Sequence, residues 1–198
     1  LMQNANVSQK TRRLTTMALL VAIAVVLVAL IHFPILPAAP FLEYDPADIA
    51  IFIGTFLFGP GAGFGITVVA SVIQGLTVSA ASGWIGIVMH ILATGSYVLV
   101  AGIIYRRRHD RRGAIAALVA GTLVMTAVMC VCNLIFTPIF MGAPMETVVA
   151  MLLPAIIPFN LIKAGVNSVI TFLVYKPISR VVFGEKHEAT KNQTKAQE

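Results

Sequence analysis

Apolar residues fill most of this chain in long runs, which short polar or proline-containing stretches separate. Runs of this length are typical of helices that cross a lipid bilayer. The pattern predicts six spans, at about Leu14–Phe33, Pro46–Phe58, Ala62–Val78, Ile85–Tyr105, Ala114–Thr137 and Leu153–Tyr175. We therefore expect an all-α integral membrane protein in which residues 14–176 form one bundle of six transmembrane helices.

The second of these runs is too short to cross a bilayer alone. At 1.5 Å per residue, a helix over Pro46–Phe58 rises only about 20 Å, whereas the hydrocarbon core is about 30 Å thick. We expect this helix to be buried against its neighbours or to end in loop within the membrane. The stretch before it, HFPILPAAPFLEYDP, contains four prolines and is interpreted as a stiff loop over one end of the bundle.

Composition and charge agree with a multi-pass protein of the cell membrane and predict its orientation. Of the 198 residues, 58% are hydrophobic and 11% are charged, and the mean hydropathy is +0.90. Thirteen of the fourteen cations lie before the first span, in the loop 106–112 (RRRHDRR) or after the sixth span. Six spans place these groups on one side, which the positive-inside rule assigns to the cytoplasm.

Both termini are then cytoplasmic. Residues 1–13 form a short tail, and residues 177–198 form a polar tail that is expected to be disordered. The basic loop is interpreted as a topology anchor rather than a nucleic-acid contact. The carboxylates Glu43, Asp45, Asp48 and Glu146 fall on the outside.

Motifs that carry enzyme chemistry do not occur in the sequence. There is no G-x-x-x-x-G-K-[S/T] loop, no G-x-S-x-G and no H-E-x-x-H. The glycine-rich GPGAGFG at 59–65 lacks the G-x-G-x-x-G spacing and predicts a tight turn between spans two and three. We expect no catalytic activity, no metal site and no bound cofactor.

A polar face on the sixth span is the strongest sign of a binding site. Asn160, Lys163 and Asn167 are spaced i, i+3 and i+7, which places them on one side of a helix. Asn133 on span five, and Gln74 and Thr77 on span three, are expected at similar depth. A lysine at the centre of a bilayer costs about 2.5–3.5 kcal/mol on insertion scales.

Because no acidic residue is recognised inside a span, a ligand with acceptor atoms is the expected partner of Lys163. The alternative is that Lys163 pairs with an outer carboxylate and that the amides link helices to one another.

The outer loops are expected to complete the site. Leu42 and Tyr44 lie in the stretch FLEYDPADIA, and Trp84 lies between spans three and four. The alternative for Tyr44 and Trp84 is an ordinary place in the aromatic belt of the membrane interface. Asp45, Pro46 and Asp48 fit the start of a helix, with Asp at the N-cap, Pro at N1 and an acid at N3, and capping is their expected role.

Three stretches resemble a known family. FLEYDPADI followed by FGPGAGFGITVVASVIQG, and later IIPFNLIKAGVNSVITFLVYKPIS, resemble the riboflavin-specific S component, the substrate-binding membrane subunit, of energy-coupling-factor (ECF) vitamin transporters. The resemblance extends over residues 11–180. It implies six helices, cytoplasmic termini and an outer pocket. It also implies three partners, which are a transmembrane coupling subunit and two cytoplasmic ATPase subunits.

The resemblance assigns roles to particular residues as well. It implies that Asn160 and Lys163 hydrogen-bond a flavin with the help of Asn133. It implies that Ala18 and Ala22, an Ala-x-x-x-Ala pattern on the first span, dock onto the coupling subunit, with packing inside the bundle as the alternative. Glu43 receives no role.

The expected function is binding of riboflavin from the outside of a bacterial plasma membrane and its delivery for ATP-driven uptake. The alternatives are an S component for another vitamin or for FMN, and a self-sufficient small transporter. A vitamin with carboxylates would require more cations than one lysine, and the lack of intramembrane carboxylates argues against proton coupling.

Overall fold

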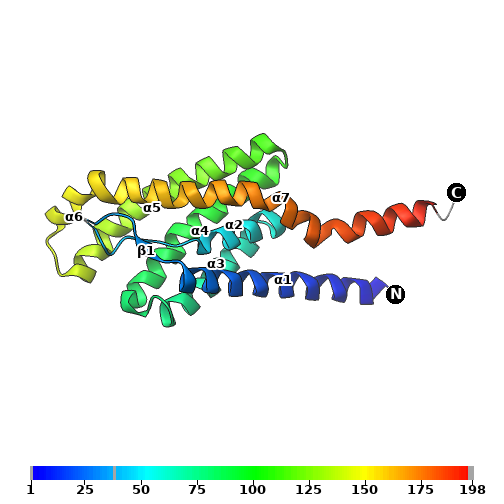
Figure 1. Cartoon of the computed structure of the whole chain (residues 1–198), viewed down its shortest axis with the longest axis horizontal. Helices are drawn as coiled ribbons and strands as arrows, with labels where there is room; N and C mark the ends of the chain where they lie inside the picture. Colours follow the sequence, from blue (N-terminus) through cyan, green and yellow to red (C-terminus); the bar gives the residue numbers. More distant parts are fainter. Residues whose placement is uncertain (1, 38, 196–198) are drawn as a thin grey trace.

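The computed structural model describes residues 2–37 and 39–195, which form a bundle of helices (Figure 1). Its larger helices are α1 (Met2–Leu30), α2 (Ala47–Phe58), α3 (Pro60–Leu76), α4 (Gly83–Arg107), α5 (Arg111–Met141) and α7 (Ile157–Lys195). Shorter elements join them: β1 (Phe33–Pro34), β2 (Glu43–Tyr44), the 3-10 turn η1 (Ala80–Ser82), α6 (Met145–Met151) and the π-helical turn η2 (Leu152–Ile156). The expected six-helix bundle is confirmed, and both chain ends lie at the same end of it.

Four segments are long and apolar enough to cross a membrane, and they are Gln9–Leu30, Ala80–Arg107, Arg111–Met141 and Met145–Arg180. The helices α2 and α3 are shorter. The predicted short second helix is confirmed, and its length is compensated by burial. Nine of its twelve residues are buried, because it contacts α1, α3, α4 and α7.

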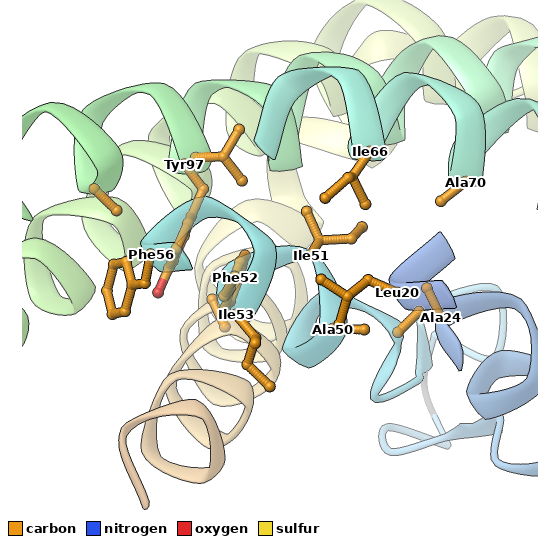
Figure 2. Packing of buried hydrophobic residues seen from close by; sticks show 14 of the residues in the cluster. Leu20, Ala24, Ala50, Ile51, Phe52, Ile53, Phe56, Ile66, Ala70 and Tyr97 are labelled. Atoms are coloured by element: carbon orange, nitrogen blue, oxygen red, sulfur yellow. The ribbon is translucent and has the colours of Figure 1, made fainter. Parts of the chain in front are cut away.

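The core is built around α2, as Figure 2 shows for its buried side chains. Phe52 of α2 stacks on Tyr97 of α4, with ring centroids 3.7 Å apart and planes 5° from parallel. On another side, Ala50 and Ile51 of α2 lie near Leu20 of α1. Neighbouring helices enclose this apolar helix on several sides, so it needs no contact with lipid. Its twelve residues therefore need not be long enough to cross the bilayer.

A single glycine separates α2 from α3. Gly59 has φ +90°, a conformation that L side chains rarely adopt, and Pro60 then occupies the first turn of α3. One turn later the backbone of Gly63 approaches α2 so closely that a Cβ atom would lie 2.0 Å from the Thr55 hydroxyl oxygen. The predicted tight turn is confirmed, but it consists of Gly59 alone, because residues 60–65 of the glycine-rich stretch already belong to α3.

Two predicted boundaries differ from the structure. α1 begins at Met2 rather than near Leu14. α7 continues as helix to Lys195, where the sequence predicts a disordered tail from residue 177, and residues 196–198 lie outside the described part. The segment after Glu185 is rich in Ala, Lys, Glu and Gln, which are strong helix formers, and it extends a helix that is already nucleated.

Candidate ligand-binding site

We call the end of the bundle that carries β1, β2, η1 and α6 the loop end; β1 and α6 lie opposite the two termini in Figure 1. The proline-rich loop before α2 packs onto this end, because Ala39 and Leu42 join a small core with Val148 of α6 and Ile156 of η2. The predicted position of this loop, over one end of the bundle, is confirmed.

A first cavity of about 190 Å³ lies beneath this loop. Its apolar wall consists of aliphatic, methionine and aromatic side chains: Phe41, Leu42, Ile85, Met89, Ala93, Met125, Met129, Phe140 and Phe159. Its polar wall includes Asn133, Thr137, Asn160, Lys163, His90, Ser82 and Glu43. Three of the residues singled out by the sequence, Asn133, Asn160 and Lys163, therefore meet at one cavity.

A second cavity of about 160 Å³ adjoins the first. The two share Phe41, Glu43, Ser82, Gly86, His90 and Lys163. The second is completed by Asp45, Ser71, Gln74, Gly75, Ser79 and Ile87. Its lining is richer in hydroxyl, amide and carboxylate groups than that of the first, and Lys163 lies at the boundary between the two.

Lys163 has a protein partner, which agrees with the alternative that this lysine pairs with an outer carboxylate. Its Nζ donates to Oδ2 of Asp45 at 2.6 Å, and the two side chains are only 12% and 14% exposed. Since α2 is so short, the loop in front of it descends into the bundle, and this brings Asp45 to the depth of Lys163. Lys163 still lines both cavities.

Asn167, one turn further along α7, fastens the same loop. Its Nδ2 donates to the backbone oxygen of Asp45 at 3.1 Å, and its Oδ1 accepts from the Tyr44 hydroxyl at 2.9 Å. Burial and the neighbouring Asp45 carboxylate raise the pKa of Tyr44, so this phenol remains a donor. Tyr44 thus holds the loop and lines neither cavity.

The two aspartates of the DPAD stretch have different roles. The N-cap of α2 is Pro46 rather than Asp45, but Asp45 still satisfies the helix start, because its Oδ1 accepts from the Ala47 N–H at 3.0 Å. The expected capping role of Asp48 is wrong, since its side chain is fully buried. Its Oδ1 accepts from Thr94 at 3.0 Å and from His90 Nε2 at 3.2 Å.

Asp48 also contradicts the expectation that no carboxylate lies inside a span. It belongs to the first turn of α2 and lies within the bundle, not on the outside. His90 bridges onward from Asp48 to Ser71 of α3, with its Nδ1 2.8 Å from the Ser71 hydroxyl oxygen. The network links α2, α3 and α4 immediately behind the cavities.

The asparagines keep part of their hydrogen-bonding capacity available. Asn133 Nδ2 donates to Met129 O and its Oδ1 accepts from Thr137, while Asn160 Nδ2 donates to Ile156 O. Each amide nitrogen carries two hydrogens, so one donor of each remains for a ligand. The π-helical turn η2, which contains Pro154 and directly precedes α7, sets the rotation of Asn160 into the cavity.

The remaining predicted site residues are placed differently. Leu42 lines the first cavity and Gln74 the second. Thr77 donates to the Ile73 carbonyl and Trp84, 61% exposed, packs edge-on against Phe136, and neither residue lines these cavities.

Ala18 and Ala22 are both exposed on α1. The methionines and His90 in the lining had no sequence signal beyond their places in apolar runs.

An apolar helical bundle with a cavity of amides, a lysine and a methionine-rich wall defines a membrane-embedded binding protein for a small polar and aromatic molecule. Comparisons with known proteins specify the family. The profile of "ECF transporter, substrate-specific component" matches residues 12–175. The chain belongs to this family of multi-pass membrane proteins.

Relatives and solved structures support the assignment. The riboflavin transporter RibU of Staphylococcus aureus (strain TCH60) is 31% identical, over 86% of this chain and 92% of its own. The riboflavin transporter FmnP of Bacillus subtilis (strain 168) is 25% identical, over 84% and 91%.

A solved S component of a bacterial ECF transporter matches with a TM-score of 0.73 and 32% identity, over 87% and 98%. An S component for biotin, 19% identical with a TM-score of 0.61 over 85% and 93%, shares the fold.

Proposed function

We propose that this chain binds riboflavin in the paired cavities and delivers it for ATP-driven uptake as the substrate-specific component of an ECF transporter. The observation that carries the proposal is the meeting of Asn133, Asn160 and Lys163 opposite a wall of methionine, isoleucine and phenylalanine side chains. The two relatives named as riboflavin transporters support the choice of vitamin.

The chemistry of the lining suits a flavin. An isoalloxazine ring offers carbonyl oxygens and ring nitrogens as acceptors and one ring N–H as donor. An asparagine amide can both donate and accept, and a lysine only donates, so Asn133, Asn160 and Lys163 match that edge of the ring. Leu42 and the methionines provide the apolar wall for the dimethylbenzene edge. We place Gln74 in the ligand set and leave Tyr44, Thr77 and Trp84 out of it.

The charge balance disfavours carboxylate-bearing vitamins. The single lysine of the cavities is already neutralised by Asp45 at 2.6 Å, so an added carboxylate would find no unpaired ammonium. The chain in this proposal is not an enzyme and uses no cofactor, because riboflavin is cargo. Its partners are a transmembrane coupling subunit, which meets Ala18 and Ala22, and two cytoplasmic ATPases. The loop end faces the outside of a bacterial plasma membrane and the termini face the cytoplasm.

The test is a binding titration of the purified protein against riboflavin, thiamin, biotin and folate. Saturable quenching of flavin fluorescence is expected for riboflavin. Asn160→Leu should weaken its affinity about 10-fold, since one buried hydrogen bond to the ligand is lost. Thr77→Val, a matched control at the same end but outside the cavities, should bind as the unsubstituted protein does. Tighter binding of another vitamin would refute the proposal.

A further inference from the structure

A groove on the surface of the bundle lies between α5 and α7, apart from the two cavities of the loop end. It has a volume of about 400 Å³ and shares no lining residue with either cavity. The two helices pack against each other, so the groove follows the seam between them. Its walls include Ile115, Val119 and Leu123 of α5 and Gly165, Val169 and Phe172 of α7.

The groove is open on the side that faces the surrounding lipid. Ile115, Val119, Leu123 and Val169 are 50–61% exposed. Between these side chains Gly165 leaves a hollow, because a Cβ atom added to it would have no neighbour within 4 Å. A chain that lies in this hollow makes dispersion contacts with both helices at once, which a flat helix surface does not offer.

The polar groups of the groove are already bonded within the protein. Ser168 Oγ lies 2.6 Å from the hydroxyl oxygen of Tyr97 and 3.2 Å from Oγ1 of Thr122. A polar ligand group at this depth would lose its water without finding a dedicated partner, which is unfavourable. The groove therefore suits a hydrocarbon segment.

Three cations continue the groove toward the end of the bundle that carries the termini. Arg111 and Arg112 precede Ile115 by four and three residues, and Lys176 follows Phe172 by four. Residues three or four positions apart share a helix face, so the cations lie roughly 5–6 Å beyond the groove along the two helix axes. All three are exposed, and no ion pair engages them among the described residues.

The charge around the groove is positive at this one end. The nearest carboxylate in the sequence, Asp110, is engaged by the start of α5, because its Oδ1 accepts from the Gly113 N–H at 2.6 Å. Toward the loop end there is no Lys or Arg from residue 113 to residue 162. An apolar groove with cations at one end matches a molecule that has a hydrocarbon tail and an anionic head.

We propose that this groove binds one acyl chain of an anionic phospholipid and that Arg111, Arg112 and Lys176 hold its headgroup. The inference goes beyond the proposed function and does not depend on it. Long basic side chains lay their stems along apolar surface and keep their charged ends at headgroup level. Basic pockets between transmembrane helices recognise anionic headgroups, and arginine can bind a phosphate through two hydrogen bonds.

The first experiment titrates the delipidated protein in detergent with phosphatidylglycerol or phosphatidylcholine of identical acyl chains, and native mass spectrometry measures the bound lipid. Phosphatidylglycerol is expected to bind about 10-fold more tightly or better, because only its headgroup is net negative. The triple variant with Arg111→Gln, Arg112→Gln and Lys176→Gln should lose this preference.

A matched triple variant, with Lys10→Gln, Arg106→Gln and Arg107→Gln, controls for net charge. It removes the same number of exposed cations from the same end of the bundle but not from the helix faces that form the groove, so it should keep the preference. Equal affinity of the unsubstituted protein for the two lipids, or the same loss in both triple variants, would overturn the inference.

The second experiment fills the groove without a change of charge. Gly165→Leu should weaken phosphatidylglycerol binding about 10-fold, because the new side chain occupies the place of the acyl chain. The lipid-free melting temperature should not fall, since leucine favours helix and meets no neighbour there. Gly65→Leu is the matched control, because Gly65 of α3 is equally unobstructed but does not line the groove.

Unchanged lipid affinity in Gly165→Leu would overturn the inference. If that variant also lost co-purification with the coupling subunit, the groove would be assigned to a helix of a protein partner instead.

Discussion

Lys163 is the residue at which loop, helix and cavity meet. It is paired with Asp45 in a nearly buried setting and lines both cavities. Removal of one member of a buried ion pair leaves an uncompensated charge, which is much more destabilising than the loss of both members. The same lysine is proposed to donate to the flavin. Its structural and ligand roles can be separated because they depend on different partners.

We expect Lys163→Met and Asp45→Asn each to lower the free energy of unfolding by about 3 kcal/mol. Asparagine also caps helices well, so Asp45→Asn changes the charge and largely preserves the start of α2. The double variant should lose about 2 kcal/mol less than the sum of the single losses. Melting of the ligand-free proteins measures this coupling.

The affinity for riboflavin measures the second proposed role of Lys163, which is donation to the ligand. It should remain weakened about 10-fold or more in the double variant, where stability is partly restored, because the charge-assisted donor is still absent. Normal affinity in that variant would assign Lys163 to holding the loop alone. Additive losses of stability would show that the pair does not act as a unit.

At the scale of elements, α1 is the least enclosed of the long helices. Only 17% of its most apolar 18-residue stretch is buried inside the bundle, whereas 28–39% of the corresponding stretch is buried in the other three long spans. Ala18 and Ala22 lie one turn apart on its exposed side, while Ala24 is fully buried against α2. Small exposed residues permit close approach of a partner helix, as association within a membrane requires.

The pair Ala18→Leu with Ala22→Leu should leave riboflavin affinity and melting temperature unchanged, because neither side chain contacts the core. It should reduce co-purification with the coupling subunit at least several-fold. Ala24→Leu serves as the matched control. It should leave the docking face intact but destabilise the bundle by about 1–3 kcal/mol through overpacking. Wild-type co-purification of the double variant would remove Ala18 and Ala22 from the docking surface.

Across the whole molecule, charge is segregated between the two ends. The sequence has no Lys or Arg from Leu14 to Tyr105, and the loop 106–112 lies at the end that carries the termini. In the topology that we propose, the positive-inside rule assigns that end to the cytoplasm. The candidate site lies at the opposite end, which in this proposal faces the outside, where the vitamin is collected.

Cysteine labelling measures this orientation. In a background with Cys130→Ala and Cys132→Ala, an impermeant thiol reagent should label Ala81→Cys in intact cells and Arg112→Cys only after lysis. Both positions are exposed, at the loop end and in the basic loop respectively. Labelling of position 112 from outside intact cells would reverse the proposed topology.

The sequence predicts the helical bundle and the polar face of α7 that lines the site. Hydropathy locates the spans because each run is long, and helical spacing places Asn160 and Lys163 on one face. The sequence leaves open which outer carboxylate pairs with Lys163, because Asp45 lies 118 positions away along the chain. The pair also depends on the depth within the bundle at which the twelve-residue helix α2 begins. The Asp48–His90 contact is not predicted from the sequence either, because a carboxylate at a helix start normally faces water.

These long separations affect how the protein is made. When α2 leaves the ribosome, His90 has yet to be synthesised, and the partner of Asp45 follows only near the end of the chain. The carboxylates of Asp45 and Asp48 must therefore stay near the headgroups or in water until α4 and then α7 are inserted, because burial of an unpaired charge in hydrocarbon is costly. The binding site is consequently one of the last parts of the bundle to assemble, and its completion coincides with insertion of the final helix.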